Sequence, residues 1–215
     1  MDDSFASRHK SELMKILGQY LPDGIVEHCA MLIMKYNLHL HIEVERKGKL
    51  GDYHPHTGKG NHITINHNLN KYNFLITFIH ELAHHTAYKK YGSGHQPHGS
   101  EWKEEFKKHM RGPVMAGIFP ADINGPLIKH MRTPSYTHTA DLALMKALSR
   151  YDKKKQLTLD DIDEGTLFKI SNGSQSIMRK IAKRRTNVMC LEVVTNKMYL
   201  VRCITPVIRV DDTKK

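Results

Sequence analysis

Hydrophobic and polar residues alternate along the first third of the chain in two different rhythms. Residues 8–36 predict two helices separated by a break at Pro22 and Gly24. Residues 38–45 then switch to strict alternation, with Leu38, Leu40, Ile42 and Val44 on one side of a half-buried strand. A polar stretch rich in Gly and His covers residues 51–61, and a short strand is predicted at residues 62–66. We expect a small antiparallel sheet with a long loop.

The middle of the chain predicts helices. Residues 73–91 are strongly apolar, which is typical of a helix in the centre of a core. A second helix is predicted at residues 100–110, with glutamates in its first turn and lysines in its last. Residues 112–135 carry four of the eight prolines, so they are expected to form an irregular connector before a short helix at residues 140–150.

The last fifty residues predict strands. From Thr166 onward the pattern is strand-like, and residues 188–194 and 198–204 predict a hairpin that turns at Asn196 and Lys197. The whole pattern indicates an α+β protein with two parts, residues 1–138 and residues 139–215. The second part consists of a helix and a basic, β-rich region.

Composition indicates a folded protein. Hydrophobic residues make up 40% of the chain and charged residues 26%, which favours a core over disorder. No uncharged apolar stretch is long enough to span a membrane, and Met1 to Ser4 lack the pattern of a secretory signal. Cys29, Cys190 and Cys203 are too few and too scattered for a disulfide framework. We therefore expect a cytoplasmic protein with reduced thiols.

Positive charge is concentrated near the C-terminus. The formal net charge is +11, and residues 146–215 hold 16 basic and 8 acidic residues against 17 and 14 in residues 1–145. Five cations lie close together: Arg179, Lys180, Lys183, Arg184 and Arg185. Such a cluster favours binding to nucleic acid phosphates, with DNA as the expected partner and Tyr199 and Phe168 as candidates for base stacking. A solvated charged face is the alternative.

Sixteen histidines indicate a metal, and one string among them carries the chemistry. His80 and His84 lie four apart in the predicted apolar helix, so both imidazoles reach one ion from one helix face. Glu81 can then act as a general base toward a water at the ion. A chance match in a histidine-rich chain is the alternative, but burying these polar groups without a partner would be costly.

The third ligand is left open by spacing alone. Ala87 and Lys90 stand where a metzincin needs Gly and His, so that class is excluded. The candidates further along the chain are His95, His98, Glu101, Glu104 and Glu105. Other histidines have milder interpretations. We expect His39 and His41 to face solvent, and His54, His56, His62 and His67 to flank the sheet.

Two strings together resemble the SprT/Spartan-like metalloprotease family: His80-Glu81-Leu82-Ala83-His84, and then His98-Gly99-Ser100-Glu101-Trp102. The resemblance covers roughly residues 10–111. It implies a zincin-like metalloprotease domain at residues 1–138, Zn²⁺ held by His80, His84 and His98, and Glu81 as the base. The cysteine pairs of the family's C-terminal zinc ribbon are missing here, which puts a second zinc site of that kind in doubt.

The functional hypothesis is zinc-dependent peptide hydrolysis. The resemblance implies a substrate class, proteins bound or crosslinked to DNA, as in DNA repair. Substrate could align by strand addition near residues 62–66. Two rivals remain: a nucleic-acid-associated regulatory protein with a structural or vestigial zinc site, and a metallohydrolase that acts on a non-peptide substrate.

Overall fold

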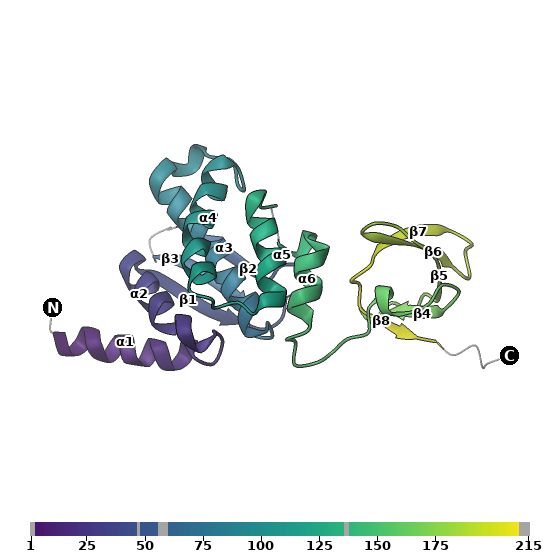
Figure 1. Cartoon of the computed structure of the whole chain (residues 1–215), viewed down its shortest axis with the longest axis horizontal. Helices are drawn as coiled ribbons and strands as arrows, with labels where there is room; N and C mark the ends of the chain where they lie inside the picture. Colours follow the sequence, from purple (N-terminus) through teal and green to yellow (C-terminus); the bar gives the residue numbers. More distant parts are fainter. Residues whose placement is uncertain (1–2, 47, 56–59, 136–137, 211–215) are drawn as a thin grey trace. The chain divides into compact units, whose positions relative to one another are not determined.

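The computed structural model describes residues 3–46, 48–55, 60–135 and 138–210, with backbone alone for residues 3–6. The chain divides into two compact units, Met1–Asp152 and Lys153–Lys215 (Figure 1). Six α-helices and two small sheets lie within the described ranges, which confirms the α+β class. The boundary expected at residue 138 falls inside the first unit. None of the helices in the described part of the chain has the length and apolarity that a membrane span requires.

Two helices open the first unit, as predicted. Helix α1 (Asp3–Leu17) and helix α2 (Val26–Tyr36) are separated by a single 3₁₀ turn, Asp23–Ile25, directly after Pro22. Helix α2 ends at Asn37, whose φ of 48° lies in the left-handed region that terminates helices. Its buried face anchors it to the core of the unit.

The first sheet consists of β1 (Leu38–Glu43), β2 (Gly51–His54) and β3 (Asn61–Asn66) in the order β1-β3-β2. Strands β1 and β3 are parallel, and β2 pairs antiparallel with β3. The sheet is therefore mixed: the expectation of an antiparallel sheet holds for β2 and β3 and is wrong for β1 and β3. After β1 the chain runs to the edge as β2 and re-enters the centre as β3, so β3 is flanked on both sides. Alternation predicts a strand and its buried face but carries no information about partners.

Helix α3 (Lys71–Tyr91) is the central element of the first unit, as its apolar sequence predicts. The side chain of Asn70 caps it by accepting hydrogen bonds from the backbone of Tyr72 and Asn73 at 3.2 and 3.0 Å. Strands β2 and β3 contact α3, and α4 (Ser100–Met115) packs along it. Thirteen of its residues are buried, so the helix is fixed over most of its length.

Residues 112–135 are mostly helical, which corrects the expectation of an irregular connector. Helix α4 continues through Pro113 to Met115, and α5 (Ala121–Arg132) contains Pro126. Each proline removes one backbone hydrogen bond from its helix. The apolar face of α5, with Ile123 and Leu127 fully buried, offsets that loss because tertiary packing supplies most helix stability in proteins.

The end of the first unit is held by buried polar contacts. Helix α6 (Leu142–Ser149) packs against α5. Asn70 donates to the carbonyl oxygen of Leu148 at 3.0 Å. His138 is buried, and its Nε2 lies 2.7 Å from Asn73 Oδ1. Burial lowers the pKa of His138 to about 3, with a smaller contribution from His130.

Acid should destabilise the first unit through His138. Its pKa is about 3 in the folded chain and about 6.5 in an unfolded one, so below pH 6.5 the unfolded state binds a proton that the folded state does not. The free energy of unfolding should therefore fall by about 2–3 kcal/mol between pH 6.5 and 4.5 on account of this residue. Urea unfolding at several pH values measures the slope. His138→Gln should make this slope shallower by about one proton per molecule.

The second unit is a five-stranded antiparallel sheet. Its strands are β4 (Leu167–Ile170), β5 (Met178–Lys183), β6 (Asn187–Glu192), β7 (Met198–Arg202) and β8 (Val207–Arg209), in the order β7-β6-β5-β4-β8. The predicted hairpin is confirmed as β6 and β7. Cys190 and Cys203 are fully buried free thiols, so they serve as small core residues.

Candidate metal centre

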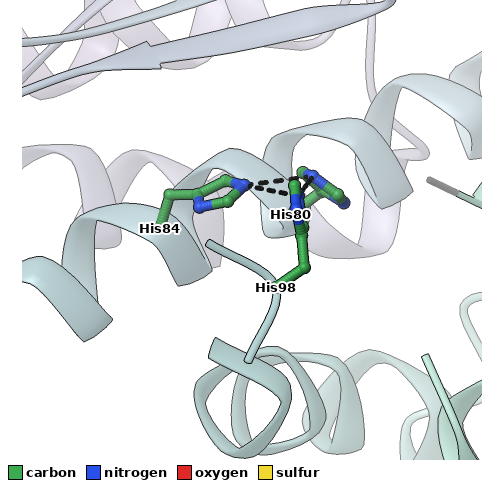
Figure 2. Close-up of side chains that lie close together, drawn as sticks. All are labelled: His80, His84 and His98. Atoms are coloured by element: carbon green, nitrogen blue, oxygen red, sulfur yellow. Dashed lines mark hydrogen bonds between the residues drawn. The ribbon is translucent and has the colours of Figure 1, made fainter. Parts of the chain in front are cut away.

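Three imidazoles from two parts of the first unit meet at one point (Figure 2). His80 and His84 project from one face of α3, and His98 comes from the loop before α4. Their Nε2 atoms form a triangle with sides of 3.1 Å (His80–His98), 3.2 Å (His80–His84) and 3.0 Å (His84–His98). Two nitrogens that bind one zinc ion at about 2.05 Å in tetrahedral geometry lie about 3.3 Å apart, close to these separations.

The protonation of the three rings suits a cation. Burial lowers the pKa of His84 to about 3, and burial also lowers the pKa of His80 and His98. All three are neutral at pH 7, so their lone pairs are available. Three nitrogens pointing at one spot cannot all satisfy each other as hydrogen-bond donor and acceptor. The three histidines can therefore hold a metal ion.

The loop that carries His98 is built for this placement. His98 has a φ of 62°, in the left-handed region that costs a non-glycine residue energy. Gly99 follows, and its amide donates to the carbonyl oxygen of Gln96 at 2.9 Å. A Cβ on Gly99 would lie only 2.9 Å from that same oxygen. The His-Gly pair thus has a geometric reason: the turn that presents His98 leaves no room for a side chain after it.

The Trp102 indole packs against all three imidazole rings. Its ring centroid lies 4.7, 5.4 and 4.8 Å from those of His80, His84 and His98. The indole is fully buried, donates to the carbonyl oxygen of His80 at 3.3 Å and stacks on Phe106. Trp102, the tryptophan of the second sequence motif, is therefore a core residue that also packs against the three imidazoles.

The structure brings His98 to the site and leaves the other candidate ligands elsewhere. His95 Nδ1 donates to the carbonyl oxygen of Gly92 at 2.7 Å, within its own loop. Glu101 accepts from Ser100, and Glu104 is exposed. Glu105 is buried among Lys90, Lys108 and His109. In the described residues, His80, His84 and His98 form the one group of three potential ligand atoms that lie within 4.8 Å of one another.

Glu81 lies next to His80 on α3 with its side chain buried. Burial raises the pKa of its carboxyl to about 8, and Asp52 adds to the rise, while Arg46 and Lys49 oppose it. The side chain packs against Gly51 at the start of β2. A Cβ on Gly51 would stand 2.8 Å from Glu81 Oε1 and 2.7 Å from Thr77 Cγ2. Gly51 therefore provides the space in which this carboxylate sits.

Strand β2 is the element of the site that the sequence did not reveal. From Gly51 it runs along α3 to Tyr53, whose hydroxyl donates to Asn61 Oδ1 and lies 3.3 Å from His85 Nδ1. In the described part of the chain it is an edge strand, whereas β3, where strand addition was expected, is the central strand and is paired on both sides. The one hint of this strand in the sequence was Gly51, which lies in the stretch that was predicted to be a loop.

The five cations of the basic cluster are not all exposed, because successive residues of β5 point to opposite sides. Arg179, Arg184 and Arg185 are exposed. Lys183 pairs with Asp160 at 2.6 Å. Lys180 is buried, and its ammonium donates to the carbonyl oxygens of residues 159 and 162 at 3.0 and 2.6 Å. Lys180 therefore does not belong to the exposed set, because it points into the unit like every second residue of the strand. Of the two aromatic candidates, Phe168 is fully buried and Tyr199 is 43% exposed.

Comparison with known proteins adds no relative: a scan against protein-family models, a search of curated proteins and a search of solved structures each returned no match.

Proposed function

We propose that this chain is a zinc-dependent metallopeptidase with a zincin-like first unit, and that it acts on proteins associated with DNA. The observation that supports this best is that three Nε2 atoms lie within 3.2 Å of one another. Buried Glu81 directly follows one of these histidines, His80, in the sequence. Structural zinc sites are closed by four protein ligands, whereas catalytic sites use three and keep one position open. Three is the number found here among the described residues.

Zinc fits this donor set best. Imidazole nitrogen is a borderline ligand that suits zinc, and three histidines with an open position are a common catalytic zinc set. When bound, zinc would supply Lewis-acid chemistry by polarising the scissile carbonyl and by making a water more acidic. The ligands would be His80, His84 and His98, whose rings are held in place by contact with Trp102.

Glu81 moves the proton in this proposal. Its carboxylate accepts a proton from the attacking water while the water oxygen bonds to the carbonyl carbon. It then donates that proton to the amine nitrogen as the C–N bond breaks, and the carboxylate returns to its starting state. A divalent cation nearby favours the ionised carboxylate and so opposes the rise in pKa that burial causes.

An extended substrate would align on β2. This strand lies at the edge of the described sheet, and it begins at Gly51, in contact with Glu81. Strand addition uses main-chain hydrogen bonds and therefore needs little side-chain specificity. This suits a peptidase with low sequence preference.

Gly51→Ala tests the placement of Glu81. The new methyl group would displace the Glu81 carboxylate, so we expect hydrolysis to fall by about 10- to 100-fold with zinc content unchanged. Zinc is measured by atomic emission and hydrolysis with a protein substrate. Gly125→Ala is the matched control, because Gly125 lies in α5 with no atom near its potential Cβ. Equal activity in both variants would remove Gly51 from the site.

The second unit would bring the peptidase to DNA-bound substrates. Arg179, Arg184 and Arg185 are exposed on or next to β5, and Tyr199 offers a partly exposed ring for stacking. Binding to the same DNA raises the effective concentration of substrate without a dedicated pocket. The family resemblance points to the same substrate class.

Replacing Arg179, Arg184 and Arg185 together by glutamine should weaken binding to single-stranded DNA. The slope of log K against log salt should become shallower by about 2, because each phosphate that is no longer neutralised accounts for about 0.7. Fluorescence anisotropy over a salt series measures both quantities. A control with the same change in charge replaces exposed Arg111, Lys129 and Arg132 of the first unit. An equal weakening in that control would assign the effect to net charge.

The proposal is tested with the zinc-loaded chain of residues 1–215 and a DNA-binding protein as substrate, with and without single-stranded DNA. We expect cleavage that single-stranded DNA accelerates. Cleavage that ignores DNA would keep the peptidase and remove the basic unit from the mechanism. Turnover of a small ester or amide without cleavage of any protein would favour a hydrolase with a non-peptide substrate. Zinc retained without any turnover would favour the regulatory alternative.

A further inference from the structure

A second group of histidines lies on the outer face of the first sheet, opposite the face that packs on the core. Successive strand residues point to opposite faces, and Ile63 and Ile65 of β3 are buried on the core side. The register places His39 of β1, His62 of β3 and His54 of β2 in one row across the outer face. The next row holds His41, Thr64 and Asp52. His67 lies beyond the end of β3 and is exposed, and His56 lies outside the described residues.

Two of these rings bring a pair of nitrogens as close together as the nitrogens of the first site. His41 Nε2 lies 3.0 Å from His62 Nδ1. The rings are stacked, with centroids 5.2 Å apart, and His39 also stacks with His62, at 5.0 Å. Gly60 packs directly against the His39 ring, where a Cβ would come within 2.6 Å of it. The pair is thus held in a stack of three imidazoles.

We propose that His41 and His62 form a second metal site, which takes a divalent transition-metal ion of the zinc and nickel class. Two imidazole nitrogens 3.0 Å apart match the nitrogen separations of the three-histidine site, and this donor type selects such ions. Only the first site brings three potential ligand atoms together in the described residues, so the second site has two preformed ligands. His41 is exposed and His62 half-buried, so water can complete the coordination.

The neighbouring strand offers a further donor pair on the same face. His54 Nε2 lies 3.0 Å from Asp52 Oδ2, one row apart on β2. An ion at His41 and His62 would link β1 to β3 and stabilise the sheet from the side opposite α3. This site is independent of the proposed peptidase activity, because it shares no residue with the first site.

Equilibrium dialysis of the chain of residues 1–215 against buffered zinc tests the second site, with bound metal counted by atomic emission. The wild type should bind one zinc at low free concentration and a second at higher concentration. His41→Gln and His62→Gln should each weaken the second binding step by about tenfold or more and leave the first unchanged. The double variant should lose no more than either single variant, since one ligand without the other does not chelate. His67→Gln is the matched control.

Three outcomes would overturn this inference. The wild type could stop at one zinc per chain, the His62→Gln variant could bind the second ion as tightly as the wild type, or His67→Gln could weaken it equally. The last result would mean scattered binding to surface histidines. If the first site were wrong, the wild type would lack the binding step at low free zinc. The His98→Ala variant tests that site separately, because it should lose this tight step and keep the weaker one.

Discussion

Glutamine in place of Glu81 should reduce peptide hydrolysis by about 10³-fold and leave the zinc content unchanged. Glutamine has nearly the same size as glutamate, so it fits the narrow space beside Gly51 and Thr77 without repacking. It cannot accept the proton of the attacking water. Since Glu81 is not among the three ligands, the metal should stay bound. The effect should therefore appear in kcat and not in metal affinity.

The measurement compares initial cleavage rates of zinc-loaded wild type and Glu81→Gln on one protein substrate, with zinc counted in both samples. Glu104→Gln is the control, because it makes the same change on the exposed surface of α4. A Glu81→Gln variant that cleaves at close to the wild-type rate with full zinc would exclude Glu81 as the base. Loss of zinc from this variant would assign the residue to metal binding instead.

Alanine in place of His98 should weaken zinc binding by on the order of 100-fold or more and abolish hydrolysis. His98 supplies one of three ligands, and it projects from a loop. The fold should survive its loss, because the core lies in α3, the sheet and Trp102. Zinc at about 1,000 times its Kd stabilises a protein by about 4 kcal/mol, so the wild type should gain roughly 8–16 °C in Tm on zinc addition. His98→Ala should lose most of that gain.

His95→Ala is the matched control for His98. It lies in the same loop, and its Nδ1 donates to the carbonyl oxygen of Gly92, away from the other two ligands. This variant should keep zinc, the Tm gain and activity. The reverse pattern, with zinc lost from His95→Ala and kept by His98→Ala, would contradict the assignment of the third ligand. A chelator should convert the wild type to the low-Tm form, and added zinc should reverse the change.

Part of the candidate site was predictable because helix geometry is local. The four-residue spacing of His80 and His84 places both rings on one helix face whatever the rest of the chain does. The third ligand lies across a loop, and spacing alone left five candidates. The resemblance favoured His98, and the left-handed φ of His98 with the cramped Gly99 after it gives that choice a physical reason.

Other features depend on contacts that no local pattern encodes. The order β1-β3-β2 makes β2 the edge strand, and alternation cannot reveal which strands are neighbours. Helices α4 and α5 continue through Pro113 and Pro126 because packing of their apolar faces outweighs local preference. The contact between Gly51 and Glu81 joins residues that are thirty positions apart. By contrast, the burial of Lys180 could have been read from strand alternation with Met178.

Intact mass spectrometry of a DNA-binding protein, after incubation with the zinc-loaded chain and single-stranded DNA, shows whether the three histidines and Glu81 together support hydrolysis of a peptide bond. The wild type should form fragment pairs whose masses sum to that of the substrate plus one water, and Glu81→Gln should form none. Substrate left uncut by folded wild type that holds one zinc at His80, His84 and His98 would exclude this function.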